Sequence, residues 1–279
     1  MNGFRYVIAD VFTDTPLEGN QVAVFTDARE IPEDKLQQIA REMNLSETVF
    51  VYKPEGEGDA RIRIFTPTIE MQFAGHPTLG TAFVLSAPLS LEQIKLETLR
   101  GLVPVRLERE DGRIVFGRME QPLPTVEPYE DDELFDILGV GGAVLPVEVY
   151  DNGVQHVYIC LGSEEEVAGL APDLRRLGAR APLCFNCFAG EGRSWKTRMF
   201  APSSGVAEDP ATGSAAGPLA LHLARHGRIA FGDEIEISQG VEVGRPSKLY
   251  ARVDGSADEV ERVEVGGAAV TVARGELKI

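Results

Sequence analysis

Apolar and polar residues alternate in short segments through the first half of the chain, and this period of two predicts β-strands. The strand-like segments are residues 4–11, 21–25, 48–52, 61–65, 102–108 and 113–119. Between the second and third segments the apolar period lengthens, so that Leu36, Ile39 and Met43 fall on one face of a helix. Pro32 suits the first turn of that helix, and the two acidic residues after it favour the positive end of the helix dipole.

The second half shows the same mixture, which indicates an α+β protein. Strands are predicted at residues 145–150, 156–161, 183–188, 195–200, 234–238, 248–253, 260–265 and 269–272. Short acidic helices are expected within residues 164–178, and a longer helix runs from Gly213 to just before Gly227.

A proline-rich joint at Gln121–Pro124 marks the predicted domain boundary. It separates a first domain, residues 1–120, from a second, residues 121–267. The last strand, about residues 268–279, can pack back on the first domain.

One five-residue pattern occurs in both halves and suggests an internal repeat. Arg63–Pro67 and Arg198–Pro202 share an arginine, a phenylalanine and a proline at matching positions. Each is followed by a loop, by a glycine and a polar residue (75–76 and 213–214), and by a small-residue helix. Five residues alone could match by chance, but the shared context favours duplication. Two similar halves facing each other would bring two helix N-termini, with free N–H groups, to one cleft.

Charge and composition narrow the class of protein. The chain carries 27 basic and 44 acidic residues, a net charge of −17, which argues against nucleic acid or an anionic membrane as a partner. A small anionic substrate is not excluded, because donors inside a cleft can outweigh the overall field. We find no signal-peptide pattern, and the longest apolar runs fall well short of the roughly 20 residues that span a bilayer. We therefore expect a soluble, cytoplasmic protein.

The three cysteines, Cys160, Cys184 and Cys187, fit a reducing compartment better than a disulfide framework. Cys184 and Cys187 have the spacing of a redox pair. Their segment is apolar and strand-like, however, and no helix starts after it, which favours structural burial.

Glu47 is the first candidate for chemistry. It follows the first predicted helix and opens a strand, with Leu45, Val49 and Phe50 around it. Partial desolvation there would favour the protonated carboxyl group, which suits a residue that both accepts and returns a proton. The alternative is a residue that only completes the helix end, and spacing alone leaves both interpretations open.

Two further segments, Gly75–Pro77 and Asp209–Ser214, precede the small-residue helices. Glycine lets the backbone approach a ligand, and a helix start offers N–H donors to a carboxylate or oxyanion. Asp209 could equally be a turn residue and Ser214 a cap, so neither segment is specific by itself. Their matching positions in the two halves favour a shared site.

Patterns for metals and cofactors are weak. His222 and His226 are four residues apart on a helix, but no H-E-x-x-H motif or further ligand accompanies them, so a metal site is not favoured. The chain also lacks a phosphate-binding loop, a dinucleotide-binding glycine pattern and a nucleophile elbow. We therefore expect chemistry without a metal or other cofactor.

Three segments together resemble the signatures of the PhzF family, the phenazine-biosynthesis isomerases and their relatives. These are Asn44–Glu47, Phe73–Pro77 and Glu208–Ala215, and the resemblance covers essentially the whole chain. It implies a diaminopimelate-epimerase-like fold, in which two similar domains each wrap a curved sheet around a central helix. It also implies a site in the cleft between the domains, and a homodimer.

The resemblance also assigns roles to residues. Glu47 matches the catalytic carboxylate of the family. Positions that line its pocket match Asn20, Ser46, Gly75, His76, Asp209, Gly213 and Ser214. The implied activity is isomerisation of a dihydro-hydroxyanthranilate, a small carboxylic acid, to an aminoketone, with Glu47 moving a proton along one face of the ring.

The sequence differs from those of epimerases with this fold in one respect that bears on the type of reaction. Epimerases of this fold carry a cysteine in each half, one removing a proton and the other supplying one. The corresponding segments here, Ala74–Pro77 and Pro210–Gly213, contain no thiol, which disfavours two-base racemisation. Pro210, where phenazine enzymes are expected to have alanine, leaves open a related isomerase or epimerase acting on another small cyclic or amino acid. Outside enzymes, the alternative is a scaffold that binds a small acid or a partner protein without turnover.

Overall fold

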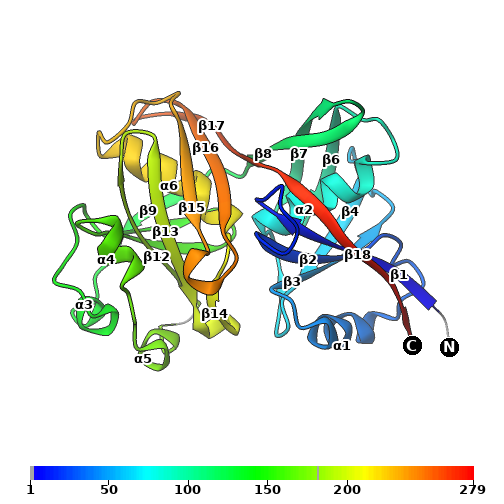
Figure 1. Ribbon diagram of the computed structural model, residues 1–279, viewed down its shortest axis with the longest axis horizontal. Coiled ribbons are helices and arrows are strands. Elements are labelled where there is room, and N and C mark those ends of the chain that lie inside the picture. Colours follow the sequence, from blue (N-terminus) through cyan, green and yellow to red (C-terminus); the bar gives the residue numbers. More distant parts are fainter. Residues whose placement is uncertain (1–2, 181) are drawn as a thin grey trace.

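The first lobe is a sheet wrapped around one helix, and it is built almost entirely from the first half of the chain (Figure 1). The computed structural model describes residues 3–180 and 182–279; the start of the chain, on which the expected lack of a signal peptide partly rests, lies outside the described residues. The elements of this lobe are β1 (Gly3–Val11), β2 (Asn20–Phe25), α1 (Glu33–Met43), β3 (Glu47–Tyr52), β4 (Ala60–Phe65), β5 (Glu70–Met71), α2 (Gly75–Ser86), β6 (Gln93–Thr98), β7 (Gly101–Glu110) and β8 (Arg113–Gln121).

The second lobe follows the same plan, with short helices added at its outer edge (Figure 1). Its elements are β9 (Thr125–Pro128), α3 (Leu134–Leu138), β10 (Glu148–Asp151), β11 (Gln155–Cys160), α4 (Glu164–Ala168), α5 (Leu174–Gly178), β12 (Cys184–Glu191), β13 (Ser194–Ala201), β14 (Val206–Asp209), α6 (Gly213–Arg225), β15 (Glu234–Gln239), β16 (Ser247–Gly255) and β17 (Val260–Gly267). Short 3-10 turns lie at Pro202–Ser204 and Val241–Val243. The last strand, β18 (Ala269–Lys278), returns to the first lobe.

Strand pairing repeats between the lobes. β2 lies parallel to β3 and β4 parallel to β6, and the same relations hold for β11 with β12 and β13 with β15. The arginines of the repeated segment also make matching ion pairs: Arg63 binds Glu70 through two nitrogens, and Arg198 binds Glu208 in the same way. The short sequence echo therefore marks equivalent places in two copies of one fold.

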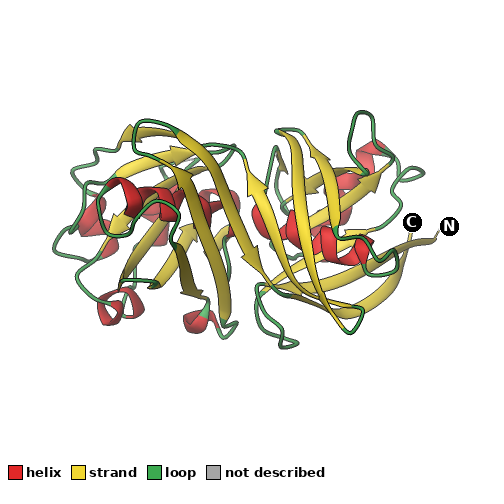
Figure 2. Cartoon of the chain, turned by 90° about the horizontal axis from the view of Figure 1, so that it is seen from above, coloured by secondary structure: helices red, strands yellow, loops and turns green. Residues whose placement is uncertain are grey.

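Helices α2 and α6 are the centres of the two lobes, and the strands curve around them (Figure 2). Nearly every residue of both helices is buried, so neither has a polar face, as expected of a helix enclosed by a sheet. Sequence reasoning placed Gly75–Pro77 before the helix, whereas these residues form the first turn of α2. Pro77 is tolerated there because the first N–H groups of a helix have no partner within it.

The two lobes share strands rather than meeting only through a linker. Met119 of β8 is paired with Val105 in the first lobe and with Val265 of β17 in the second. β18 lies antiparallel to β1, so the chain crosses the joint a second time. The domain division that we propose, after residue 120, therefore falls at the end of a shared strand and not in a loop.

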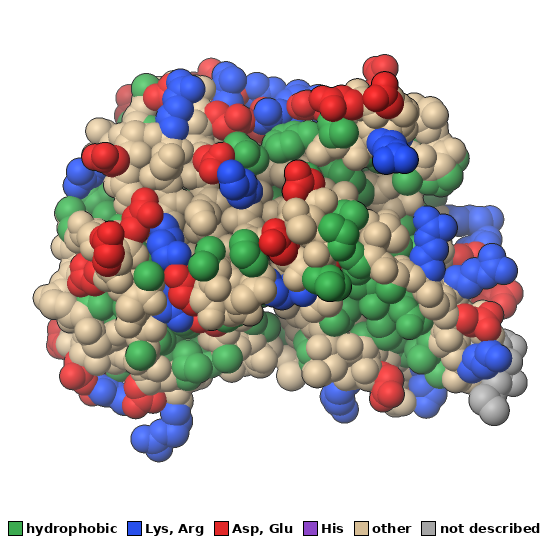
Figure 3. Space-filling view, in the orientation of Figure 1, with side chains coloured by type: hydrophobic (Ala, Val, Ile, Leu, Met, Phe, Trp, Pro, Cys, Tyr) green, Lys and Arg blue, Asp and Glu red, His purple; other side chains and the backbone are tan. Residues whose placement is uncertain are grey.

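On the surface, acidic and basic side chains are interspersed over the face shown in Figure 3.

Candidate active site

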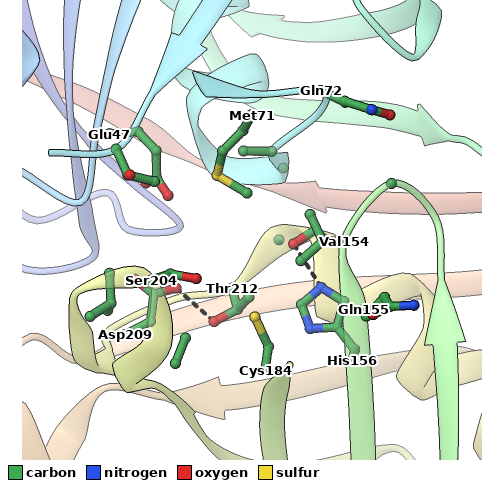
Figure 4. Close-up of a pocket in the computed structure, with 18 of the residues that line it drawn as sticks. Glu47, Met71, Gln72, Val154, Gln155, His156, Cys184, Ser204, Asp209 and Thr212 are labelled. Carbon is green, nitrogen blue, oxygen red and sulfur yellow. Dashed lines mark hydrogen bonds between the residues drawn. The ribbon is translucent and has the colours of Figure 1, made fainter. Parts of the chain in front are cut away.

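A cavity of about 450 Å³ lies between the lobes and takes its walls from both. Glu47 and Met71 of the first lobe face Cys184, His156 and Thr212 of the second across an open space (Figure 4). A volume of this size suits a small organic ligand such as a substituted six-membered ring. Both lobes are therefore needed to form the site.

The starts of α2 and α6 meet at one wall of this cavity. A Cβ atom added to Gly75 would lie 2.4 Å from the backbone of Gly213 and Ser214, so only glycine permits the approach. Neither helix has a side-chain cap on its first turn. Two sets of N–H donors and two positive dipole ends therefore point to one place, which suits a carboxylate.

Glu47 begins β3 and is held close to His76. It is buried, and its Oε2 lies 3.0 Å from His76 Nε2. The N–H of that ring nitrogen is directed at the carbonyl oxygen of Gln21, 3.2 Å away. Oε2 of Glu47 consequently has no hydrogen-bond partner among the described residues, although it is buried. A carboxylate oxygen in this position is free to take a proton from a ligand.

His76 is surrounded by negative charge. Burial alone would lower the pKa of its imidazole, but the carboxylates of Glu47 and Asp209 outweigh burial and raise that pKa above its ordinary value. The two acidic side chains therefore favour the protonated form of the ring.

Asp209, at the end of β14, is held by two donors. Thr212 Oγ1 donates to Oδ2 at 2.7 Å, and Asn20 Nδ2 donates to Oδ1 at 2.8 Å. Burial raises the pKa of this carboxyl group to about 6, with His76 opposing the rise and Glu47 adding to it. The side-chain amide of Gln239 donates to the backbone oxygen of Asp209 at 2.8 Å, which fixes the strand end.

Most of the residues predicted for the site lie together. Those that line the cavity are Glu47, Gly75, His76, Asp209, Gly213 and Ser214. Asn20 and Ser46 are not part of the wall. Asn20 is fully buried behind it, where its amide also donates to Ala211 O at 2.8 Å and lies 3.1 Å from His76 Nδ1. Ser46 is half-buried just before β3. Their roles in binding stay predictions.

Sequence reasoning did not select His156, Cys184 or Arg100, which also line the cavity. Cys184 is the first residue of β12, as Glu47 is the first residue of β3. The residue after each is paired with the phenylalanine of the repeated segment, Thr48 with Phe65 and Phe185 with Phe200, so Glu47 and Cys184 occupy equivalent positions. Extending the repeat alignment to these strand starts would have found Cys184. Burial raises the pKa of its thiol to about 12, so it stays protonated.

A cluster of potential metal ligands lies elsewhere, at the end of α6. Glu148 Oε2 is 3.1 Å from His222 Nδ1 and 3.0 Å from His226 Nε2, and it accepts a hydrogen bond from the Tyr150 hydroxyl at 2.8 Å. Nε2 of His222 has no partner within the described residues, whereas metal-bound histidines usually anchor their second nitrogen. These contacts are more consistent with a hydrogen-bonded anchor for the helix end than with a metal centre.

A comparison with protein-family models matches residues 9–275 to PhzC-PhzF, described as phenazine biosynthesis-like protein. The chain belongs to this family. Within it, the trans-2,3-dihydro-3-hydroxyanthranilate isomerase of Pseudomonas aeruginosa is 52% identical over 97% of this chain and 98% of its own length. The protein of the same name from Pseudomonas chlororaphis is 53% identical over 98% of this chain and 99% of its own.

Solved structures agree with the PhzC-PhzF assignment. A PhzF-family phenazine biosynthesis protein of Bacillus anthracis is superposed with a TM-score of 0.86 over the full length of both chains, at 26% identity. A hydroxyproline epimerase of Agrobacterium vitis has the same fold, with a TM-score of 0.67 at 14% identity, and covers 99% of this chain and 91% of its own. The diaminopimelate-epimerase-like fold expected from the motifs is therefore confirmed.

Proposed function

We propose that this protein is a trans-2,3-dihydro-3-hydroxyanthranilate isomerase in which Glu47 carries the migrating proton. The observation that carries the proposal is the Glu47 carboxylate, which is buried in the cavity and whose Oε2 makes no hydrogen bond within the described residues. Identity of 52–53% to isomerases of that name, over nearly the whole chain, supports the choice of substrate.

In this mechanism the substrate carboxylate lies against the starts of α2 and α6, where N–H donors from both lobes converge. His76 and Asp209 orient the hydroxyl and amino groups. Glu47 Oε2 then takes the proton from the hydroxyl-bearing ring carbon, and the electron pair of that C–H bond moves into the ring π system. The same carboxyl group returns the proton to another carbon on the same face, and the resulting enol relaxes to the aminoketone.

A single carboxyl group suffices because the proton stays on one ring face. The segments Ala74–Pro77 and Pro210–Gly213 carry no thiol that could act from the opposite face. Each role assigned to the protein, namely binding, orientation and proton transfer, falls on a side chain or an N–H group, so we propose that the reaction needs no cofactor.

We further propose that the protein works in the cytoplasm as a homodimer. Among the described residues, no helix has the length and apolar character needed to cross a membrane. The net charge of −17 disfavours nucleic acid as a partner. Light scattering coupled to gel filtration tests the dimer: a mass near twice 30.3 kDa is expected, and a monomer at working concentration contradicts it.

The function is tested by incubating the protein with trans-2,3-dihydro-3-hydroxyanthranilate in heavy water and following the ultraviolet absorbance of the ring. We expect conversion to the aminoketone, with any deuterium entering at the carbon that receives the proton. Deuterium at an α-carbon with loss of stereochemistry would instead indicate an epimerase. Tight binding without conversion would indicate a binding protein, and either outcome overturns the proposal.

A further inference from the structure

His156 is a cavity residue that the proposed mechanism does not use. It is the second residue of β11, it is fully buried, and its ring points at the start of α6 (Figure 4). Nε2 lies 3.0 Å from the Ser214 hydroxyl oxygen. On the other side of the ring, Nδ1 lies 3.3 Å from the side-chain nitrogen of Asn186, which is also buried. The ring therefore links a buried amide to a hydroxyl group in the cavity wall.

The position of the ring proton follows from these contacts. Burial lowers the pKa of His156 to about 3, so the ring is neutral and carries one N–H. The amide nitrogen of Asn186 donates to the backbone oxygens of Val157 and Cys184, both 3.3 Å away, and has no lone pair to accept with. A hydrogen on Nδ1 would point at this donor, so the ring proton lies on Nε2. Nε2 then donates to Ser214 Oγ, which acts as the acceptor in that bond.

This arrangement determines what Ser214 offers to a ligand. Within residues 3–180 and 182–279, His156 is the only hydrogen-bond partner of the Ser214 hydroxyl. Because Oγ already accepts from His156, its own hydrogen is available to the cavity, beside the N–H groups of the first turn of α6. With the opposite tautomer, Ser214 would donate to the ring and present lone pairs to the cavity, which would repel a carboxylate.

Other hydrogen bonds hold the backbone at Ser214 in place, independently of its hydroxyl group. Asn152 Nδ2 donates to Ser214 O at 2.8 Å, and the Tyr158 hydroxyl donates to Ala215 O at 2.6 Å. Loss of the His156 side chain would therefore let the Ser214 hydroxyl group rotate freely, while the bonds from Asn152 and Tyr158 still hold the start of α6.

We propose that His156, held in one tautomer by Asn186, is a positioning residue that makes the Ser214 hydroxyl a dedicated donor to the substrate carboxylate. The inference rests on the proposed function for the identity of the ligand, but it makes a separate claim about selectivity. The site should discriminate a carboxylate from a neutral amide of the same shape, and His156 should supply part of that discrimination without touching the ligand.

The experiment compares the affinity of anthranilate with that of anthranilamide, measured by calorimetry. These aromatic analogues share ring and amino group and differ only in the carboxylate. In His156→Leu we expect anthranilate to bind about tenfold more weakly, as loss of a hydrogen bond to a charged group predicts, while anthranilamide changes little. His156→Gln, whose amide nitrogen can reach the place of Nε2, should restore most of the preference.

Two further variants separate positioning from folding. Ser214→Ala should lose the same preference, and His156→Leu should add little to it, because both changes remove one donor. Tyr158→Phe is the matched control: it removes a buried bond to α6 but should leave the preference intact. Equal losses for both analogues in His156→Leu, or losses that add in the double variant, would overturn the inference, as would failure of anthranilate to bind the wild-type protein. Affinities do not depend on turnover, so a protein that binds selectively but does not isomerise would refute the proposed function alone.

Discussion

The surroundings of His76 and Asp209, at the centre of the cavity, change the proton affinities of both side chains. Attraction to two carboxylates raises the pKa of His76, and burial raises the pKa of Asp209 to about 6. Oε2 of Glu47 lies 3.0 Å from His76 Nε2 but makes no hydrogen bond within the described residues. The histidine, between two acidic side chains, therefore holds a proton more readily than a free imidazole does. Such an arrangement can bind polar groups of a substrate while leaving one carboxylate oxygen for proton transfer.

The pKa of Asp209 predicts the acid side of the pH profile. Below about pH 6 its carboxylate gains a proton and loses its ability to accept from the substrate, so kcat/KM should fall as pH decreases through this value. Asp209→Asn should be less active and should lack the step near pH 6. Initial rates between pH 5 and 8 check this, and an unchanged step in the variant would contradict it.

At the residue scale, sequence reasoning found the polar residues that stand beside a glycine or within a few residues of a helix end. Glu47, His76 and Asp209 are of this kind, and all three line the cavity. His156 had no such signal, because it stands at the start of an apolar strand, with neither a glycine nor a helix end next to it. Its significance comes from Ser214, which is 58 residues away in the chain, and sequence spacing does not reveal such a contact.

At the scale of elements, the contact between the starts of α2 and α6 depends on backbone without side chains. Gly75→Ala would place a methyl group 2.4 Å from the backbone of Gly213, where nothing flexible can yield. We expect a loss of about 1–3 kcal/mol in unfolding free energy, as for overpacking of a core, together with a raised KM.

Gly141→Ala is the matched control for that substitution. A Cβ at Gly141 meets nothing within 4 Å, so stability and KM should stay close to wild type. Chemical denaturation and steady-state kinetics on both variants check the prediction. A Gly75→Ala protein with wild-type KM would show that the close approach of the two helices is not needed for the site.

Most elements were predicted, including α6 and the short helices α4 and α5, whereas β5, β6, β9, β14 and α3 were not. The span Gly213 to just before Gly227 matches α6, and the strands with clear alternation match their observed partners. β5 and β14 were missed because they hold only Glu70–Met71 and Val206–Asp209, too few residues for a period to show. Tertiary pairing, not local pattern, makes them strands, and the ion pairs Arg63–Glu70 and Arg198–Glu208 fasten both of them.

At the scale of the whole molecule, Phe12 connects the lobes. It belongs to the first lobe, yet its fully buried ring lies against Gly213 and Gly267 of the second. Its backbone is also bound across the joint, with Phe12 N–H donating to Ala268 O and Lys248 N–H donating to Phe12 O, both at 2.8 Å. Its φ of 65° is unusual for a residue with a side chain, so packing must hold it there.

Phe12→Ala should therefore loosen the site as well as the fold. We expect a loss of about 3–5 kcal/mol in stability, as for other buried phenylalanines, and a clearly raised KM. Phe25→Ala removes an equally buried ring from a cluster around α1, away from the joint, and should lower stability with little change in KM. Thermal unfolding and kinetics distinguish the two, and equal KM values would contradict the role given to Phe12.

The central claim is that Glu47 is the proton carrier, and its most direct test is the turnover of Glu47→Gln. The variant keeps the shape of the side chain but cannot take a proton. We predict that it folds normally and binds anthranilate with near wild-type affinity, while kcat for trans-2,3-dihydro-3-hydroxyanthranilate falls by about 10²- to 10⁴-fold. A Glu47→Gln protein that isomerises the substrate at a rate near that of wild type would contradict the account.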